Sequence, residues 1–148
     1  KNNKPLFGAA SDPLSNEVWI DGGKTGNESV PLENMIIAST APDVMFVGNK
    51  YEKKITQFLN KNKTIEFRNA KSFLDVIEGK ADVAIEASLS LHDIGALIPI
   101  VKKSGCIATD FDGNNYDSIT FEFNNDKYDF LVTRNIETTN KILQEIRE

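Results

Sequence analysis

Apolar and polar positions follow two different periods along this chain, and the two periods predict alternating strands and helices. Short apolar runs bounded by turn-forming residues are typical of strands, and apolar residues spaced three or four apart are typical of amphipathic helices. After an opening hairpin, the β-α-β-α-β order favours an α/β fold, a layered α/β/α sandwich with a central mixed sheet. The predicted strands cover residues 6–10, 18–21, 35–39, 64–68, 82–87, 106–110, 119–123 and 129–132, and the predicted helices cover 51–60, 72–78, 93–104 and 136–147.

The stretch 84–101 is the most informative part of this pattern. An apolar run ends at Glu86, and a second carboxylate, Asp93, opens the next helix three residues after Ser90, which is the spacing of a capping box. Pro99 lies inside that helix and predicts a bend at Gly95, whose carbonyl group it crowds. Because ligand sites of open α/β sheets lie at the carboxyl ends of strands, both acids are predicted at that end. The apolar face of the helix consists of Ile94, Leu97, Ile98 and Val101.

From the residues alone, each candidate also has a simpler interpretation. Asp93 is an acid in the first turn of a helix, where the helix dipole stabilises it by roughly 0.3–1 kcal/mol. Glu86 is an acid at the end of a strand. His92 is the single histidine, and no serine, cysteine or second acid is placed around it as a triad. A packing role, or a role in supporting a neighbouring site residue, is therefore favoured. Cys106 begins an apolar stretch and predicts a buried, inert thiol.

Composition narrows the class of protein. A chain of 148 residues with 40% apolar residues predicts one globular domain over residues 1–148. The net charge of −5 and the scattered lysines argue against binding to nucleic acid, which requires clustered basic residues. No apolar run is long enough to span a membrane, and the lone cysteine indicates a reducing compartment, so the expected location is cytoplasmic.

A longer motif surrounds the two acids. Glu86 is followed by Asp93-Ile94-Gly95-Ala96, then by Gly105, and then by Thr109-Asp110-Phe111-Asp112-Gly113. This pattern resembles the C-terminal motif of the inositol monophosphatase family, which reads acid, aromatic-Asp-Ile-Ala-Ala, helix, Ala-Gly-Gly and Thr-Asp-aromatic-x-Gly. Residues 93–100 and 32–46 are most similar to the histidinol-phosphatase-like branch, and the resemblance runs from about Pro5 to the C-terminus.

The resemblance implies a chemistry. Enzymes of this family are Mg²⁺-dependent phosphomonoesterases with two lobes, in which one metal ion prepares a water and another stabilises the leaving oxygen. It implies a hydrolase acting on a small phosphorylated metabolite, of the inositol-phosphate or histidinol-phosphate type. By the same resemblance, Asp93 is a metal ligand and Glu86 contacts a substrate hydroxyl or amine. No catalytic residue is assigned to this chain, because the groups that position the base belong to the other lobe.

The chain also departs from the family pattern. The Glu-Glu pair and the Asp-Pro-Ile/Leu-Asp-Gly-Thr motif of the N-terminal lobe do not occur, and Asp12-Pro13-Leu14 predicts only a turn. The chain is therefore interpreted as the C-terminal lobe, with the N-terminal metal-binding lobe absent, and is expected to be inactive alone. Family members carry a glycine-containing motif near the phosphate, a few residues after an arginine. This motif is missing after Arg68, so either Lys71 or Ser72 contacts the phosphate in its place or this copy is degenerate.

Two other function classes stay open. The runner-up is a non-catalytic lobe or pseudoenzyme that binds a small solute or a partner protein. A lobe of a solute-binding protein has similar layers, although the spacing of Glu86 and Asp93 speaks against it. Apolar surface is expected beside the strands near Phe7 and Trp19, which predicts a homo-oligomer or a separate N-terminal lobe as partner.

Overall fold

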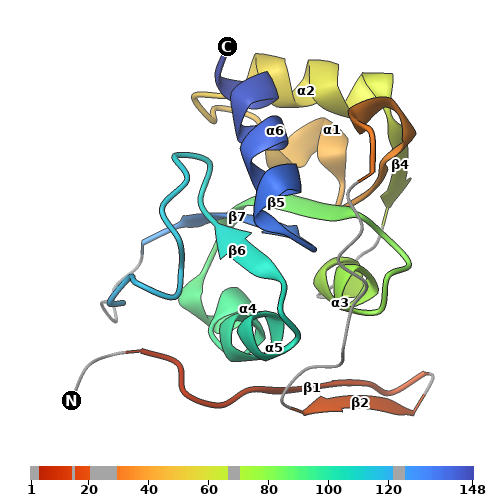
Figure 1. Ribbon diagram of the computed structural model, residues 1–148. Coiled ribbons are helices and arrows are strands. Elements are labelled where there is room, and N and C mark those ends of the chain that lie inside the picture. The colour runs from red at the N-terminus through yellow and green to blue at the C-terminus, as the bar shows by residue number, and fades with distance from the viewer. Residues whose placement is uncertain (1–3, 15, 21–29, 67–70, 122–125) are drawn as a thin grey trace.

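A five-stranded mixed sheet separates two layers of helices (Figure 1). The computed structural model describes residues 4–14, 16–20, 30–66, 71–121 and 126–148. The strand order is β4-β3-β5-β7-β6, in which β3 is parallel to β4 and β5, and β7 is antiparallel to β5 and β6. The predicted α/β/α sandwich with a mixed sheet is confirmed. The strands are β3 (Ile36–Ser39), β4 (Lys63–Glu66), β5 (Val83–Leu89), β6 (Ile107–Thr109) and β7 (Tyr128–Thr133).

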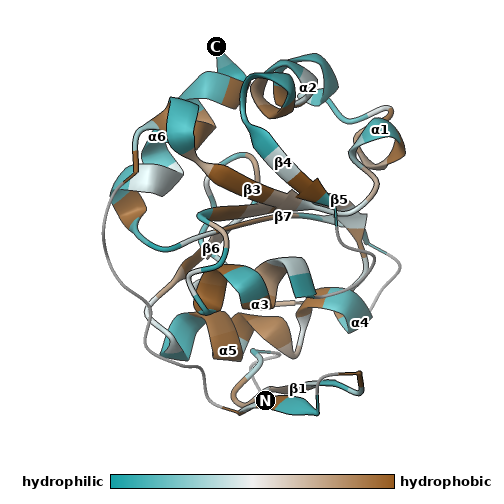
Figure 2. Ribbon diagram, turned by 90° about the vertical axis from the view of Figure 1, so that its right-hand side faces the viewer, coloured by the Kyte–Doolittle hydropathy of each residue, from teal (hydrophilic) through white to brown (hydrophobic). Residues whose placement is uncertain are grey.

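Each face of the sheet has its own apolar core. Helices α3, α4 and α5 cover one face, and α1, α2 and α6 cover the other, as the brown inner surfaces in Figure 2 show. Because successive strand residues point to opposite faces, Ala84 and Glu86 of β5 face α3 and α5, whereas Val83 and Ile85 face α2 and α6. The helices are α1 (Pro42–Met45), α2 (Glu52–Lys61), α3 (Lys71–Ile77), α4 (Leu91–Ile94), α5 (Leu97–Lys103) and α6 (Ile136–Arg147).

The single helix predicted over residues 93–104 is wrong in two respects. The helix starts earlier, at Leu91, and is interrupted at Gly95 and Ala96, so that it forms α4 and α5. Pro99 has no N–H to donate to the carbonyl of Gly95, and its ring crowds that carbonyl. The bend expected at Gly95 is thus an interruption of the hydrogen-bond pattern. The four residues of the predicted apolar face are all buried: Ile94, Leu97, Ile98 and Val101.

The opening hairpin forms a separate two-stranded sheet below α5 (Figure 1), with β1 at Ala9–Asp12 and β2 at Glu17–Ile20. The predicted turn is present, and the backbone N–H of Leu14 donates to Asp12 Oδ1 at 2.9 Å. The first strand begins at Ala9 rather than Leu6. Gly8 is required where the chain passes the start of α5, because a Cβ there would lie 1.8 Å from the carbonyl oxygen of Ala96.

The apolar surface expected on the hairpin is confirmed for most of its residues but not for Trp19. Trp19 is only 8% exposed, and its Nε1 donates to Glu78 Oε1 at 2.8 Å, which anchors the hairpin to the end of α3. Its neighbours point away from the body of the protein. The large apolar side chains that stay exposed are those of Leu6, Phe7, Leu14, Val18 and Ile20.

The strand predicted over residues 119–123 is wrong for residues 119–121, which have no regular structure, and residues 122–123 lie outside the described residues. The alternation of Ile119 and Phe121 instead reflects a loop that packs on the core. The rings of Phe121 and Tyr116 stack with centroids 5.8 Å apart. The pattern did not predict α1 or the 3-10 helix Leu32–Asn34, because single turns are too short to show a helical period.

Candidate functional site

Glu86 is the middle residue of β5, level with the position directly after the end of β3, and is 4% exposed. Its cross-strand neighbour on β7 is Phe130, whose ring packs edge-on against Phe73 with centroids 4.9 Å apart. This apolar side of the site removes water from the carboxylate, and burial raises the pKa of Glu86. Glu86 is therefore a buried acid held on one side by aromatic rings, and not the surface acid of the simpler interpretation.

Thr40 supplies the polar side of the same site. The parallel register pairs Ala38 of β3 with Ala84 of β5, so Thr40, two residues further on, lies level with Glu86. The Thr40 hydroxyl Oγ1 donates to Glu86 Oε1 at 2.8 Å, and this bond lowers the pKa of Glu86 in opposition to burial. Sequence reasoning did not single out Thr40. The available signal was its place directly after a strand predicted to lie beside that of Glu86.

Ser72 approaches Glu86 from α3. Its side chain is fully buried, and it lowers the pKa of Glu86 together with Thr40. Its Oγ makes no hydrogen bond of good geometry with the described residues. Lys71 and Ser72 were the two candidates to replace the missing glycine motif, and Ser72 is thus the one that lies beside Glu86. Lys71 turns instead to the Asp75 carboxylate, with Nζ 3.3 Å from Oδ1, and Arg68 lies outside the described residues.

Asp93 occupies the third position of α4 and closes the predicted capping box with Ser90. Both the backbone N–H and the hydroxyl of Ser90 donate to Asp93 Oδ2 at 2.7 Å. The Ser90 hydroxyl is the main reason why the pKa of Asp93 is lowered, and the positive charges of Lys127 and His92 contribute further. Asp93 is exposed and ionised, and the capping box holds its carboxylate in a fixed position.

The structure brings Glu86 and Asp93 to the same end of the sheet, as predicted. Glu86 lies level with Thr40, just beyond the end of β3, and α4 starts two residues after β5 ends. The two carboxylates are near enough that the negative charge of Asp93 contributes to the raised pKa of Glu86. Between them, the register of β5 on β7 shifts after Glu86, and Ser88 has a positive φ of 58°. Such irregularities re-aim the chain at the end of a strand.

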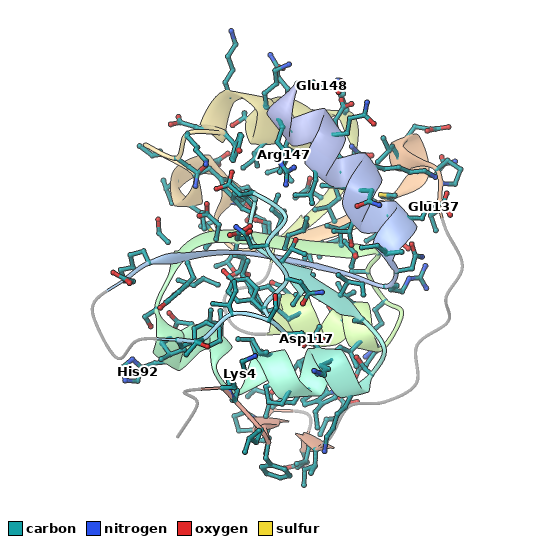
Figure 3. All side chains as sticks on the ribbon, turned by 60° about the vertical axis from the view of Figure 1, so that its left-hand side comes forward. Lys4, His92, Asp117, Glu137, Arg147 and Glu148 are labelled. Carbon is teal, nitrogen blue, oxygen red and sulfur yellow. The ribbon has the colours of Figure 1, made fainter. Side chains whose placement is uncertain are left out.

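His92 and Cys106 take no part in this arrangement of groups. His92, the second residue of α4, is exposed and projects outward (Figure 3), so the packing role, one of the two expected for it, is wrong. Its remaining link to the site is the positive charge that lowers the pKa of Asp93. Cys106 is buried and forms no disulfide, so the predicted burial of this thiol is confirmed.

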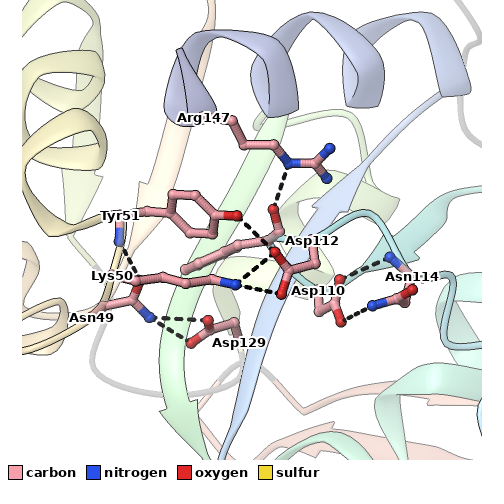
Figure 4. Close-up of polar contacts among 9 residues, drawn as sticks. Asn49, Lys50, Tyr51, Asp110, Asp112, Asn114, Asp129 and Arg147 are labelled. Carbon is pink, nitrogen blue, oxygen red and sulfur yellow. Dashed lines mark hydrogen bonds and ion pairs between the residues drawn. The ribbon is translucent and has the colours of Figure 1, made fainter.

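The acids of the motif Thr109–Gly113 have structural contacts instead (Figure 4). Asp112 accepts hydrogen bonds from Lys50 Nζ and from the Tyr51 hydroxyl, each at 2.7 Å, and the bond from Lys50 is the main cause of its lowered pKa. Asp110 accepts hydrogen bonds from Asn114. Arg147 Nε donates to the carbonyl of Phe111 at 2.8 Å. This motif therefore ties the start of α2 and the end of α6 to the loop after β6.

The described part of the chain holds neither a complete metal site nor a membrane span. No group of three or more histidine, cysteine, aspartate or glutamate side chains within it is arranged to hold a metal ion. Nor does any helix in that part have the length and apolar character needed to cross a bilayer.

Comparison with known proteins agrees with the family resemblance of the motif. The profile described as the inositol monophosphatase family matches residues 1–148. A comparison with curated protein sequences finds no match. Solved structures of similar fold include an inositol monophosphatase from Zymomonas mobilis, at 20% identity and a TM-score of 0.78, with 100% of this chain and 60% of that chain covered.

Two further structures show the same likeness. The extragenic suppressor protein suhB from Bartonella henselae has 19% identity and a TM-score of 0.75, with 98% of this chain and 58% of that chain covered. Inositol monophosphatase II from Staphylococcus aureus has 15% identity and a TM-score of 0.74, with 96% and 56% covered. At such identities the likeness shows the fold alone. The chain spans about three-fifths of the length of these relatives.

Proposed function

This chain belongs to the inositol monophosphatase family, and from that premise we propose that it forms the C-terminal lobe of a Mg²⁺-dependent phosphomonoesterase. The proposed substrate is a small phosphorylated metabolite of the inositol-phosphate or histidinol-phosphate type. In this proposal Asp93 supplies one metal ligand, and Glu86 contacts a hydroxyl or amine of the substrate. The observation that carries the proposal is the meeting of these two acids, in different environments, at the end of the sheet where β3 ends and α4 begins.

The surroundings of Asp93 fit a ligand of Mg²⁺. Mg²⁺ prefers hard oxygen ligands and is often bound through one or two carboxylates and several waters. The lowered pKa of Asp93 keeps its carboxylate ionised at neutral pH. Ser90 engages Oδ2, and no hydrogen bond from the described residues reaches Oδ1. One oxygen is thus held by the protein while the other points away from that bond.

Glu86 is suited to a different task. A bound Mg²⁺ would supply charge stabilisation to the phosphoryl group and activation of water, whereas a buried carboxylate beside Phe130 recognises a polar group by hydrogen bonds. A substrate hydroxyl or ammonium that reaches Glu86 would also meet the unpaired hydroxyl of Ser72. Interactions of buried polar groups discriminate strongly against ligands that lack the matching group.

A paramagnetic titration tests the metal site without requiring turnover. Mn²⁺ added to the isotopically labelled chain is expected to broaden the amide signals of Ser90 and Asp93 first, and Asp93→Asn is expected to abolish this selective broadening. Glu137→Gln is the matched control, because Glu137 is also an acid in the first turn of a helix but lies at the opposite end of the sheet. Broadening that survives in Asp93→Asn, or that centres equally on Glu137, would contradict the proposal.

The chain alone is proposed to lack appreciable phosphatase activity, because the described residues contain no group of three or more acidic, histidine or cysteine side chains that could hold a metal ion. Assays of the purified chain with several phosphomonoesters and Mg²⁺ should show no turnover above the Asp93→Asn background. Robust turnover that is lost on chelation would show that the 148 residues contain a complete active centre.

The exposed hairpin favours a second candidate, in which the chain binds another polypeptide. Leu6, Phe7, Val18 and Ile20 are between 56% and 85% exposed; the first two precede β1, and the other two lie on β2. Grouped apolar side chains of this kind mark interfaces. The proposed partner is a separate N-terminal lobe or a second copy of the chain. Light scattering that shows a monomer at all concentrations would exclude the second copy, and a chain carrying Phe7→Ser and Val18→Ser would serve as the control.

A further inference from the structure

The contact between Thr40 and Glu86 extends the proposed function beyond the two acids. We infer that Thr40 is a positioning residue for Glu86: its hydroxyl holds the carboxylate in one orientation, with one oxygen left for the substrate. This assignment rests on the proposed substrate contact of Glu86. Thr40 itself need not touch the substrate, since it acts through the orientation of Glu86.

The two carboxylate oxygens of Glu86 have different surroundings. A protein hydroxyl donates to one of them, and the other is left for a ligand. An ionised carboxylate accepts hydrogen bonds at both oxygens and donates none. Thr40 Oγ1 donates to Oε1 at 2.8 Å, and no hydrogen bond of good geometry from the described residues reaches Oε2. The aromatic side of the site, at Phe130, has no hydrogen-bond donor to offer. Among the described residues, Thr40 therefore makes the well-aligned hydrogen bond that orients the carboxylate, and Ser72 is a weaker neighbour of it.

Ser72 gives further support for a polar ligand beside Glu86. Its side chain is 0% exposed, and its Oγ lies close enough to Glu86 to lower the pKa of that carboxyl group but makes no hydrogen bond of good geometry with the described residues. A buried hydroxyl without a well-aligned hydrogen bond costs free energy, and a structural role alone would not compensate for that cost. A polar group of a ligand that contacts Glu86 would satisfy this hydroxyl as well. Thr40 and Ser72 thus have different tasks, since one holds the carboxylate and the other adds to the recognition surface.

The backbone after Thr40 is held in an unfavourable conformation that keeps the hydroxyl in place. Ala41 has φ 42° and ψ 59°, in the left-handed region, and Pro42 starts α1 directly afterwards. A left-handed conformation is unfavourable for a residue with a Cβ, because the Cβ comes too close to the following carbonyl oxygen. Residues in such conformations cluster at functional sites. Because β-branched Thr40 also has few side-chain rotamers, the direction of its hydroxyl is set by the turn.

An NMR titration of the Glu86 side-chain carboxyl carbon tests this inference in the chain as it is. Thr40→Val keeps the shape of the side chain and removes the hydroxyl, so the pKa of Glu86 should rise further. Thr40→Ser should restore the value of the unmutated chain. Asp93 is the charged group of the described residues that acts on Glu86, and it is unchanged in both variants. Thr64→Val is the control, because Thr64 donates to the carbonyl of Leu59 on another part of the sheet.

The outcomes separate the inference from the proposed function. An unchanged Glu86 titration in Thr40→Val, or a Ser variant that behaves like the Val variant, would overturn the positioning role. If Thr40→Val does not fold, an NMR measurement on the unmutated chain tests the inference. A slowly exchanging Thr40 hydroxyl proton coupled to the Glu86 carboxyl carbon is expected, and its absence would overturn the inference. A failed Mn²⁺ titration would instead refute the metal site and leave the Thr40 result unaffected.

Discussion

Glu86 and Asp93 lie at the same end of one sheet, but their surroundings change their acidity in opposite directions. Glu86 is buried beside Phe130, and loss of water raises its pKa, although the Thr40 hydroxyl opposes that rise. Asp93 is exposed at the start of α4, and two hydrogen bonds from Ser90 lower its pKa. Pairs of acids whose environments separate their pKa values commonly have different tasks in one site. The difference teaches that burial, more than position along the fold, decides what each carboxylate can do.

The largest expected effect comes from removing the apolar side of the Glu86 site. Phe130→Ala should cost about 3–5 kcal/mol of unfolding free energy, because a buried aromatic ring is replaced by a cavity. It should also admit water and lower the pKa of Glu86 towards the ordinary range. Phe46→Ala is the matched control: Phe46 is equally buried but packs in the other core, so it should cost similar stability and leave Glu86 unchanged. Urea denaturation and NMR titration measure the two quantities, and equal effects of both variants on Glu86 would refute burial as the cause.

Removing the charge of Glu86 should stabilise the protein at neutral pH. A raised pKa in the folded state means that the carboxyl group contributes stability below its unfolded pKa, and that this contribution is lost as the pH rises through the folded value. Glu86→Gln avoids that loss, so it should be more stable than the unmutated chain at pH 8 by on the order of 1 kcal/mol. The difference should vanish near pH 4. Urea denaturation at several pH values would detect a Gln variant that is less stable at pH 8, which would contradict this prediction.

The opposite pH dependence is expected at Asp93. Ser90→Ala removes the hydroxyl of the capping box and should cost about 0.5–1 kcal/mol near pH 7. Because the pKa of Asp93 is lowered, its contribution is present above the unfolded pKa and lost as the pH falls through the folded value. The cost should therefore shrink in acid.

Asn135→Ala provides the control for Ser90→Ala. Asn135 caps α6 by accepting the N–H of Thr138 at 2.8 Å, and its amide carries no charge. Its loss should have a similar cost near pH 7 that does not shrink in acid. Parallel pH profiles for the two variants, followed by thermal unfolding, would argue against an electrostatic role of the Ser90 contact.

The smallest effect is expected at Ala41. Ala41→Gly relieves a left-handed conformation but increases the flexibility of the unfolded chain, so the net gain should be about 0.5 kcal/mol. The variant also loosens the turn that carries Thr40, and the signal of the Thr40 hydroxyl proton should exchange faster with water. A variant that is less stable than the unmutated chain would show that the turn is not strained.

Local sequence patterns were sufficient for most of the fold. The periodicity of residues 136–147 predicted α6 with both of its ends, and the apolar face from Ile94 to Val101 is buried as expected. The capping box of Ser90 and Asp93 was also readable, because its partners are three residues apart. The strand predicted at 119–123 was wrong over 119–121, because an apolar alternation is equally compatible with a loop whose rings pack on the core.

The sequence by itself determined the layers, the family motif and the two acids near each other, since these depend on short-range periodicity and spacing. Only the tertiary structure decided that Glu86 is buried against Phe130 and that Thr40 donates a hydrogen bond to Glu86. It also decided that Asp112 accepts hydrogen bonds from Lys50 and Tyr51 and is not part of the candidate site. The partners in these contacts are 44, 46, 62 and 61 residues apart, respectively. No local pattern encodes such pairs, because they follow from the register of strands and the packing of helices, which form only when the whole chain has folded.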